Sequence, residues 1–213
     1  MSAMLPVGQR AHPPRIREER FLDAARDVFR EEGHAATTAR IAQRAGVSKG
    51  IIFYRYKSRE ALLAAVIRRE TEPPEALHEL ARAAGERTVG ENLADILGVL
   101  LEAIARAHPF LELADASPAS AEVRRALTAG SRKPPQERMV GVVARYLRDE
   151  IRFGRVRRID PLPLAQALLG GCIEYVRSRP VAGHGDDGGF VHGLVNVVLH
   201  GAFAAEAPAA GRG

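Results

Sequence analysis

Basic side chains cluster in one short stretch of this 213-residue chain. The segment from Arg40 to Arg59 holds six Lys or Arg residues and no Asp or Glu. Closely spaced cations attract polyanions, because their fields add where phosphate groups approach. Such a segment could bind the phosphates of a nucleic acid or the headgroups of a membrane surface. A basic segment that is merely solvated would have the same composition.

Two short helices separated by a tight turn are predicted to position these cations. The first begins at Thr37, whose hydroxyl suits an N-cap, and ends at Gly46, which can adopt the positive φ of a tight turn. The second runs from about Ser48 to Tyr56. This order is typical of a helix-turn-helix, whose second helix enters the major groove of DNA. Since Gly46 and Ser58 divide the basic stretch, a continuous membrane-surface helix is excluded.

The excess positive charge lies entirely in the first 60 residues. The chain has 31 Lys and Arg against 26 Asp and Glu; residues 1–60 have 12 against 7, which leaves 19 against 19 for residues 61–213. A single cysteine, Cys172, excludes an internal disulfide, and no apolar run approaches the roughly 18 residues of a membrane span. Because the N-terminus also lacks a signal-peptide core, we expect a cytoplasmic protein.

Apolar residues recur at spacings of three and four along most of the chain, and no alternating strand pattern occurs. We therefore predict an all-α fold of about nine helices. Prolines and glycines mark many of their ends. Besides the two short helices, we expect helices at about 15–33, from Ser58 up to Pro73, and at 89–107, 119–129, 135–153, 161–178 and 189–204.

A series of short motifs follows in order between Arg15 and Ile67. They are Phe21-Leu-Asp-Ala-Ala, Phe29, Gly33, Thr37-Thr38, Ile41-Ala42, Ala45-Gly-Val-Ser-Lys-Gly50, Phe53-Tyr54, Tyr56 and Ser58-Arg-Glu-Ala-Leu62. In these positions the sequence resembles the TetR family of transcriptional regulators. After Ile67 the resemblance is looser and rests mainly on the lengths of the helices.

The resemblance implies a homodimeric repressor that binds double-stranded operator DNA and is released by a small-molecule effector. The implied organisation is a flexible arm (1–14), a three-helix helix-turn-helix domain (15–60), a helical bundle for ligand binding and dimerisation (61–206) and a disordered tail (207–213). No enzymatic activity and no cofactor is expected, because no nucleophile–base pair is evident. No metal site is expected either, because His192 and His200 are eight residues apart.

Several residues are expected at the DNA interface by their positions in the family pattern. Lys49 and Tyr54 could read base edges or, alternatively, contact phosphates. Arg59 takes the place of the family's usual phosphate-contacting lysine, and Arg44 is expected on a solvated face. Phe53 and Tyr56 are expected in the core. The full set of expected DNA contacts is Thr37, Thr38, Arg40, Ser48, Lys49, Gly50, Ile51, Tyr54, Arg55 and Arg59, with the three arginines on phosphates.

The helical bundle is expected to hold an apolar effector and to form the dimer. An apolar pocket with few polar groups is the usual form of a small-molecule site. The pocket candidates are Leu97, Leu101, Phe110, Met139, Val143, Tyr146 and Tyr175, many of which would otherwise be core. The last two long helices are expected to form the dimer interface, or else to pack within one subunit, through Leu168, Gly171, Ile173, Val191, Leu194 and Val198.

Two other classes of protein remain to be weighed against the repressor. A helical small-molecule-binding protein or enzyme without a regulatory role would share the bundle and its pocket. An architectural DNA-binding protein would share the basic segment, but such proteins spread their positive charge more widely than this chain does. Operator binding with and without a panel of ligands separates the three.

Overall fold

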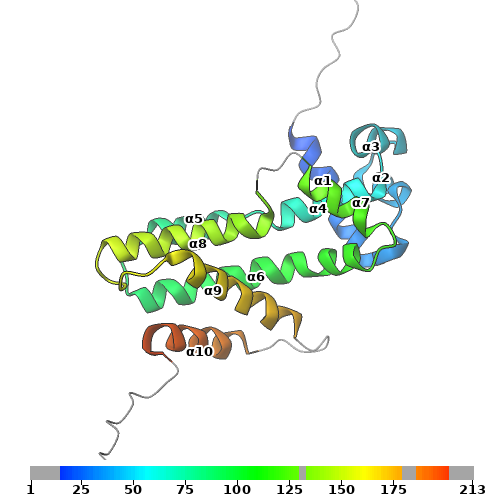
Figure 1. Cartoon of the computed structure of the whole chain (residues 1–213). Coiled ribbons are helices and arrows are strands. Elements are labelled where there is room, and N and C mark those ends of the chain that lie inside the picture. The colour runs from blue at the N-terminus through cyan, green and yellow to red at the C-terminus, as the bar shows by residue number, and fades with distance from the viewer. Residues whose placement is uncertain (1–14, 130–132, 179–185, 202–213) are drawn as a thin grey trace, which may run out of the picture. The chain divides into compact units, whose positions relative to one another are not determined.

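The computed structural model describes residues 15–129, 133–178 and 186–201. Within these ranges the chain forms ten α-helices, one 3-10 turn and no strand, which confirms the predicted all-α class (Figure 1). The predicted arm at 1–14 and tail at 207–213 lie outside the described residues. The helices are α1 (Arg15–Glu32), α2 (Thr38–Ala45), α3 (Lys49–Tyr56), α4 (Arg59–Glu70), α5 (Glu75–Arg82), α6 (Val89–Asp115), α7 (Ser120–Thr128), α8 (Pro135–Arg152), α9 (Pro161–Arg177) and α10 (Asp187–His200).

Helix α6 differs from its prediction, because it continues through Pro109 to Asp115 instead of ending near residue 107. A proline inside a helix lacks the N–H that would bond to the preceding turn. Ala107 and Phe110, on either side of it, are almost fully buried. Burying these apolar side chains offsets the loss of one hydrogen bond, which is worth roughly 1 kcal/mol. Helix α5 was not predicted at all.

The described residues fall into two compact units. The first comprises the chain up to Val66 together with Leu113–Ala126, and the second comprises Ile67–Glu112 and the chain from Leu127 onward. The N-terminal unit thus includes a segment that is distant in sequence, which the expected division after residue 60 did not foresee. Among the described helices, none is long and apolar enough to cross a membrane.

The first unit is built around the apolar faces of α1 and α4. On α1, Ala25, Val28 and Phe29 are at most 2% exposed. On α4, Leu62 and Leu63 are fully buried. Ala25, Val28 and Phe29 recur at the three- and four-residue spacing of one helix face. The buried face of α1 is therefore the one that the apolar pattern of the sequence predicts. Helices α1 and α4 therefore each bury one apolar face in the first unit.

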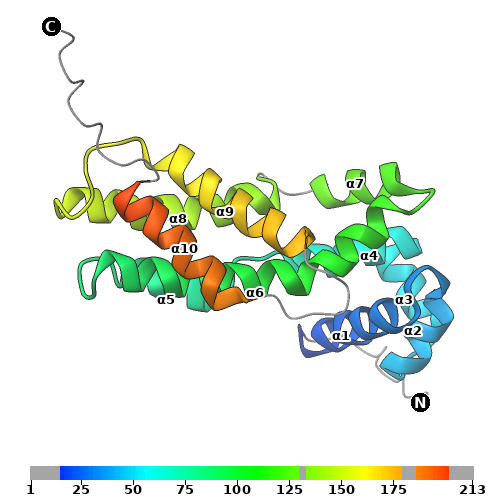
Figure 2. The same ribbon diagram turned by 90° about the horizontal axis from the view of Figure 1, so that it is seen from below.

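The second unit is a bundle in which α5, α6, α8 and α9 share one core and α10 covers one side (Figures 1 and 2). The side chains of Tyr175 on α9 and Phe190 on α10 stack with ring centroids 4.0 Å apart. Next to them, a Cβ placed on Gly171 would lie 3.6 Å from the Leu194 side chain. This is an ordinary van der Waals distance, so the approach of α10 to α9 does not require a glycine at position 171.

Candidate nucleic-acid interface and ligand pocket

The turn between α2 and α3 has the geometry of a helix-turn-helix. The Thr37 hydroxyl accepts a hydrogen bond from the Arg40 backbone N–H at 3.2 Å, which confirms the predicted N-cap of α2. Gly46 ends α2 in the left-handed conformation, with φ of 68°, and the Val47 N–H then bonds to the Ala42 carbonyl at 3.0 Å. A residue with a Cβ would be strained at Gly46, so the glycine sets the angle at which α3 leaves the turn.

Helix α3 exposes most of its surface. Ile52 is its only buried residue, at 2% exposed, whereas Ile51 is 48% and Tyr54 is 81% exposed. The expectation that Phe53 lies in the core is wrong, because its side chain is 63% exposed. Phe53 shares one helix face with Gly50, and the helical period could have placed it there. An eight-residue helix that anchors itself through a single isoleucine leaves this face available to a partner.

Lys49 and Tyr54, the expected base-edge contacts, both lie on the exposed part of α3. Lys49 has no hydrogen-bond or ion-pair partner among the residues that the structure describes. The Lys57 ammonium lies over the Tyr54 ring, 5.0 Å from its centroid, and such cation–π contact orients the ring. The sequence did not single out Lys57, although it follows Tyr54 by three residues on the same face.

The arginines of the helix-turn-helix are each held by groups of the same unit. Arg55 on α3 pairs with Glu18 of α1, with 2.5 Å between Nη2 and Oε2. Arg40 on α2 pairs with Glu32 at 2.9 Å and also donates to the Gln43 side-chain oxygen. Both arginines remain at the surface, so a phosphate could replace the glutamate as partner.

Arg44 lies on the surface of α2 and pairs with Glu31 of α1. Its guanidinium donates to both carboxylate oxygens of Glu31, at 3.0 and 2.5 Å. These hydrogen bonds hold the pKa of Glu31 below its usual value and raise the pKa of Arg44. The expected solvated position of Arg44 is therefore correct, with an added bond to α1.

The other residues expected to contact DNA differ in the exposure of their side chains. Thr38 is half-buried at the start of α2, whereas Ser48 and Gly50 are exposed at the start of α3. Arg59 begins α4, but its side chain is only 19% exposed and turns toward the carbonyl groups of residues 33–36. The α3 residues are thus exposed, whereas the Arg59 guanidinium bonds to backbone carbonyls of its own unit.

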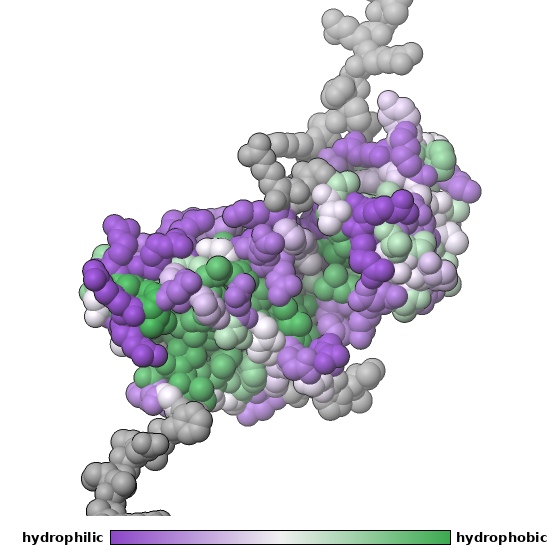
Figure 3. Space-filling view, viewed as in Figure 1, coloured by the Kyte–Doolittle hydropathy of each residue, from purple (hydrophilic) through white to green (hydrophobic). Residues whose placement is uncertain are grey.

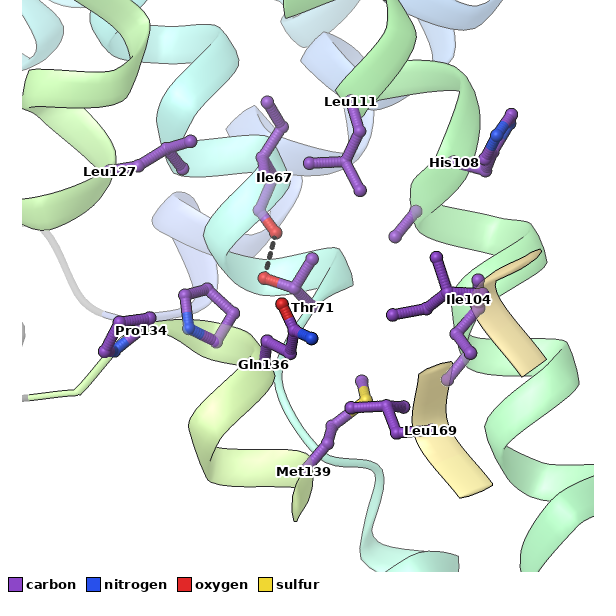
Figure 4. Close-up of a pocket in the computed structure, with 14 residues that line it drawn as sticks. Ile67, Thr71, Ile104, His108, Leu111, Leu127, Pro134, Gln136, Met139 and Leu169 are labelled. Atoms are coloured by element: carbon purple, nitrogen blue, oxygen red, sulfur yellow. Dashed lines mark hydrogen bonds between the residues drawn. The ribbon is translucent and has the colours of Figure 1, made fainter. Parts of the chain in front are cut away.

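A single apolar cavity in the second unit stands out among those that the described residues form (Figure 4). Its volume is about 300 Å³, at the lower end of the range for small-molecule sites. It is bordered by the end of α4, the second half of α6, the end of α7, the start of α8 and the middle of α9. Its apolar lining consists of Ile67, Ala103, Ile104, Ala107, Leu111, Leu127, Pro134, Pro135, Met139, Leu169 and Ile173.

Three polar side chains also line this cavity. The Thr71 hydroxyl donates to the Ile67 carbonyl at 2.7 Å, so its hydrogen is already used. Nδ1 of His108 lies 3.6 Å from the Glu112 carboxylate. The amide of Gln136 lies beside Thr71 and faces the enclosed space (Figure 4). No Lys, Arg, Asp or Glu lines the cavity, and Gln136 is the polar group best able to bind a ligand oxygen or N–H.

Comparison with known proteins identifies the first unit. Residues 21–66 match the family model of bacterial regulatory proteins of the tetR family. A curated relative, the HTH-type transcriptional regulator BetI of Klebsiella pneumoniae, is 48% identical over 54 residues, which are 25% of this chain and 28% of BetI. In these residues the chain is similar to the tetR family, and it spans little more than a quarter of the length of BetI. The matched segment contains α2, the turn and α3, so the similarity rests on the helix-turn-helix itself.

Solved structures are similar in fold to most of this chain, including the second unit. A transcriptional regulator of the TetR/AcrR family from Thermobifida fusca aligns with a TM-score of 0.62 and 26% identity, over 89% of this chain and all of that one. FadR from Bacillus subtilis, solved in complex with stearoyl-CoA, aligns with a TM-score of 0.62 and 18% identity, over 87% of this chain and all of FadR. The identity to FadR supports only the likeness of fold.

The cavity involves few of the residues that were expected to form a ligand pocket. Met139 lines the cavity as expected. Tyr175 does not, because its ring stacks on Phe190. The other five candidates are at most 2% exposed and pack in the cores: Leu97, Leu101, Phe110, Val143 and Tyr146. Helical period identifies buried faces, but it does not distinguish a filled core from the lining of a cavity, which depends on the neighbouring helices.

The residues of α9 and α10 that were expected at a dimer interface differ in what they contact within the single chain. Leu168 is 1% exposed within the single chain, so its assignment to a dimer interface is corrected to the core of its own subunit. Gly171 contacts α10 of the same chain, and Ile173 lines the cavity. Val191, Leu194 and Val198 are partly buried against the core of the same chain. Sequence reasoning missed the more exposed apolar residues of these helices: Leu162, Val197 and Leu199.

Proposed function

We propose that this TetR-family chain is a transcriptional regulator that binds operator DNA through α3. The observation that carries the proposal is the exposed face of α3, where Lys49, Ile51 and Tyr54 project from a helix anchored by Ile52. Lysine can donate to guanine, and apolar side chains can contact the thymine methyl group in the major groove. DNA binding in a bacterial cell also implies the cytoplasm. We propose repression as the mode of regulation, and no catalytic role.

The cavity of the second unit is proposed as the effector site. Its lining is almost wholly apolar and includes no permanently charged side chain, so the effector is expected to be a small, uncharged and largely hydrocarbon molecule. FadR was solved with stearoyl-CoA, which combines an acyl chain with a charged head. In this chain the cavity offers a place for an apolar body only, with Gln136 as the polar contact.

We further propose that α9 and α10 pair with those of a second copy. Leu162 is 46%, Val197 is 50% and Leu199 is 43% exposed. Apolar surface extends across the side of the second unit that carries these helices (Figure 3). Contiguous exposed apolar area of this kind marks a contact surface. A C2 dimer would present two α3 helices to two operator half-sites.

The DNA-binding proposal is tested by selection from a library of random duplexes, followed by affinity measurement on the selected sequence. A palindromic sequence bound at least about 1000-fold more tightly than random duplex supports the proposal. A chain that binds all duplexes equally would be an architectural protein, and a chain that binds none would be a small-molecule-binding protein or an enzyme. Release of the selected duplex by a compound from a panel of neutral apolar molecules identifies the effector.

The effector site is tested with the uncharged fluorescent probe N-phenyl-1-naphthylamine. Leu111 lies at the cavity and is 38% exposed, so a larger side chain can be accommodated there without overpacking the core. We expect Leu111→Trp to weaken probe binding about tenfold by closing the entrance, which corresponds to the loss of one well-packed apolar group. Phe153→Trp, at the exposed end of α8 and away from the cavity lining, is the matched control and should leave probe binding unchanged.

A further inference from the structure

Arg59 occupies the position from which the family pattern predicts a phosphate contact, yet its guanidinium is used inside the protein. Nε donates to the Ala36 carbonyl at 2.7 Å. Nη2 donates to the Gly33 carbonyl at 3.1 Å and lies 3.4 Å from the His34 carbonyl. The Cζ carbon of Arg59 lies 5.2 Å from the centroid of the Phe29 ring.

The carbonyl groups that bind Arg59 follow the end of α1, where a cation is favourable. Helix α1 ends at Glu32, and the 3-10 turn Gly33–Ala35 continues the chain toward α2. Carbonyl groups at a helix C-terminus lack helical donors and carry partial negative charge. A planar guanidinium can bond to carbonyls on two sides at once, which a lysine ammonium on a flexible stem does less well.

We call these hydrogen bonds from Arg59 to the carbonyl groups of residues 33–36 the Arg59 clamp. The clamp holds the backbone immediately before α2. Ala36, which accepts the 2.7 Å bond, is 1% exposed. The next residue, Thr37, is the N-cap of α2. Only two residues separate Arg59 from the end of α3, and one of them, Lys57, has a positive φ of 64°. One side chain therefore connects the beginning of α2 to the end of α3, the two limits of the helix-turn-helix.

We propose that Arg59 is a positioning residue, which holds α2 and α3 in the DNA-binding arrangement without contacting phosphate itself. The proposal rests on the proposed DNA-binding function of this unit. It reassigns the expected role of Arg59 for this chain. Because the clamp uses hydrogen-bond geometry and not net charge, Lys should fail to replace Arg at this position.

The test compares Arg59→Lys and Arg59→Gln on the duplex selected by the wild-type protein, over a range of salt concentrations. Both variants should bind about tenfold more weakly, as expected for the loss of charged hydrogen bonds, with the wild-type salt dependence retained. Arg55→Lys and Arg55→Gln are the matched controls: the lysine variant should keep most of the affinity, and the glutamine variant should lower the salt slope by about one unit. Wild-type binding by Arg59→Lys, with a reduced slope for Arg59→Gln, would overturn the proposal.

A second measurement separates this proposal from the proposed function. Amide hydrogen exchange of a peptide covering residues 33–40, measured without DNA, should accelerate in both Arg59 variants. Exchange in α8 should stay unchanged and shows that the variants are folded. If the wild-type protein selects no DNA, the proposed function fails, while faster exchange at 33–40 still supports the clamp and unchanged exchange overturns it.

Discussion

Arg55 of the exposed helix α3 forms an ion pair with Glu18 of α1, with 2.5 Å between the paired atoms. The side chains are 34% and 45% exposed, so water and other ions reach both groups. In the free protein Glu18 therefore occupies the place that a DNA phosphate would take on Arg55. Under the proposed function, DNA binding through Arg55 would exchange one anionic partner for another.

This exchange predicts that Glu18→Gln tightens binding to random duplex by about two- to fivefold at low salt, the equivalent of one exposed ion pair. The gain should shrink as salt is added, because both the pair and the phosphate contact are screened. Affinity is measured by fluorescence anisotropy with a labelled random duplex. Glu31→Gln, which frees Arg44 on α2 instead, is the control; an equal gain there would mean that any lost negative charge suffices.

Lys49 and Tyr54 are predicted to contribute to sequence discrimination. Their side chains are exposed on α3, and alanine at either position should cost about 1–3 kcal/mol on the selected duplex. The cost on random duplex should be smaller, because base-edge contacts exist only on the correct sequence. Equal losses of binding free energy on both duplexes would show that Lys49 and Tyr54 contact phosphates and not base edges.

Arg155 is predicted to stabilise the second unit by neutralising a buried carboxylate. Glu150 is fully buried on α8, 3.1 Å from Nε of Arg155, and its Oε1 also accepts the Gly85 N–H at 3.3 Å. Arg155→Met would leave this charge without its cation at a cost of roughly 2–3 kcal/mol, reduced because the Arg155 side chain is 27% exposed.

Urea denaturation measures this cost, and Arg152→Met supplies the control. Arg152 pairs with Asp149 at 3.1 Å, but its side chain is 76% exposed, so the control should change the free energy of unfolding by less than about 1 kcal/mol. Similar losses in both variants would show that the burial of Glu150 does not decide the effect.

The thiol of Cys172 is predicted to be inert in the folded protein. The residue is fully buried on α9, and burial raises the pKa of the thiol to about 12 from an ordinary value of 9.0. Because the folded pKa is the higher one, the stability that the protonated thiol contributes is present below pH 9 and is lost as the pH rises toward 12. Alkylation by iodoacetamide at mildly alkaline pH should therefore follow the rate of unfolding. Labelling faster than unfolding would contradict the buried position.

Features that depend on a few neighbouring residues could be predicted from the sequence. Thr37 caps α2 and Gly46 ends it, because a hydroxyl acceptor and a residue without Cβ act within a single turn of chain. The apolar period of α1 likewise predicts its buried face, including Val28 and Phe29. The resemblance to the TetR family could also be recognised from local residues, because its motifs lie within about fifty consecutive positions.

The tertiary structure alone decided which side chains face which neighbours. Arg59 is a surface cation in the sequence, but the carbonyl groups that bind it come from residues 23 or more positions earlier. Met139 lines a cavity, whereas Val143, one turn later on the same helix α8, is fully buried in the core and does not line it. Periodicity shows that a face is buried, whereas packing between distant segments determines whether that face meets a side chain, a carbonyl or a cavity.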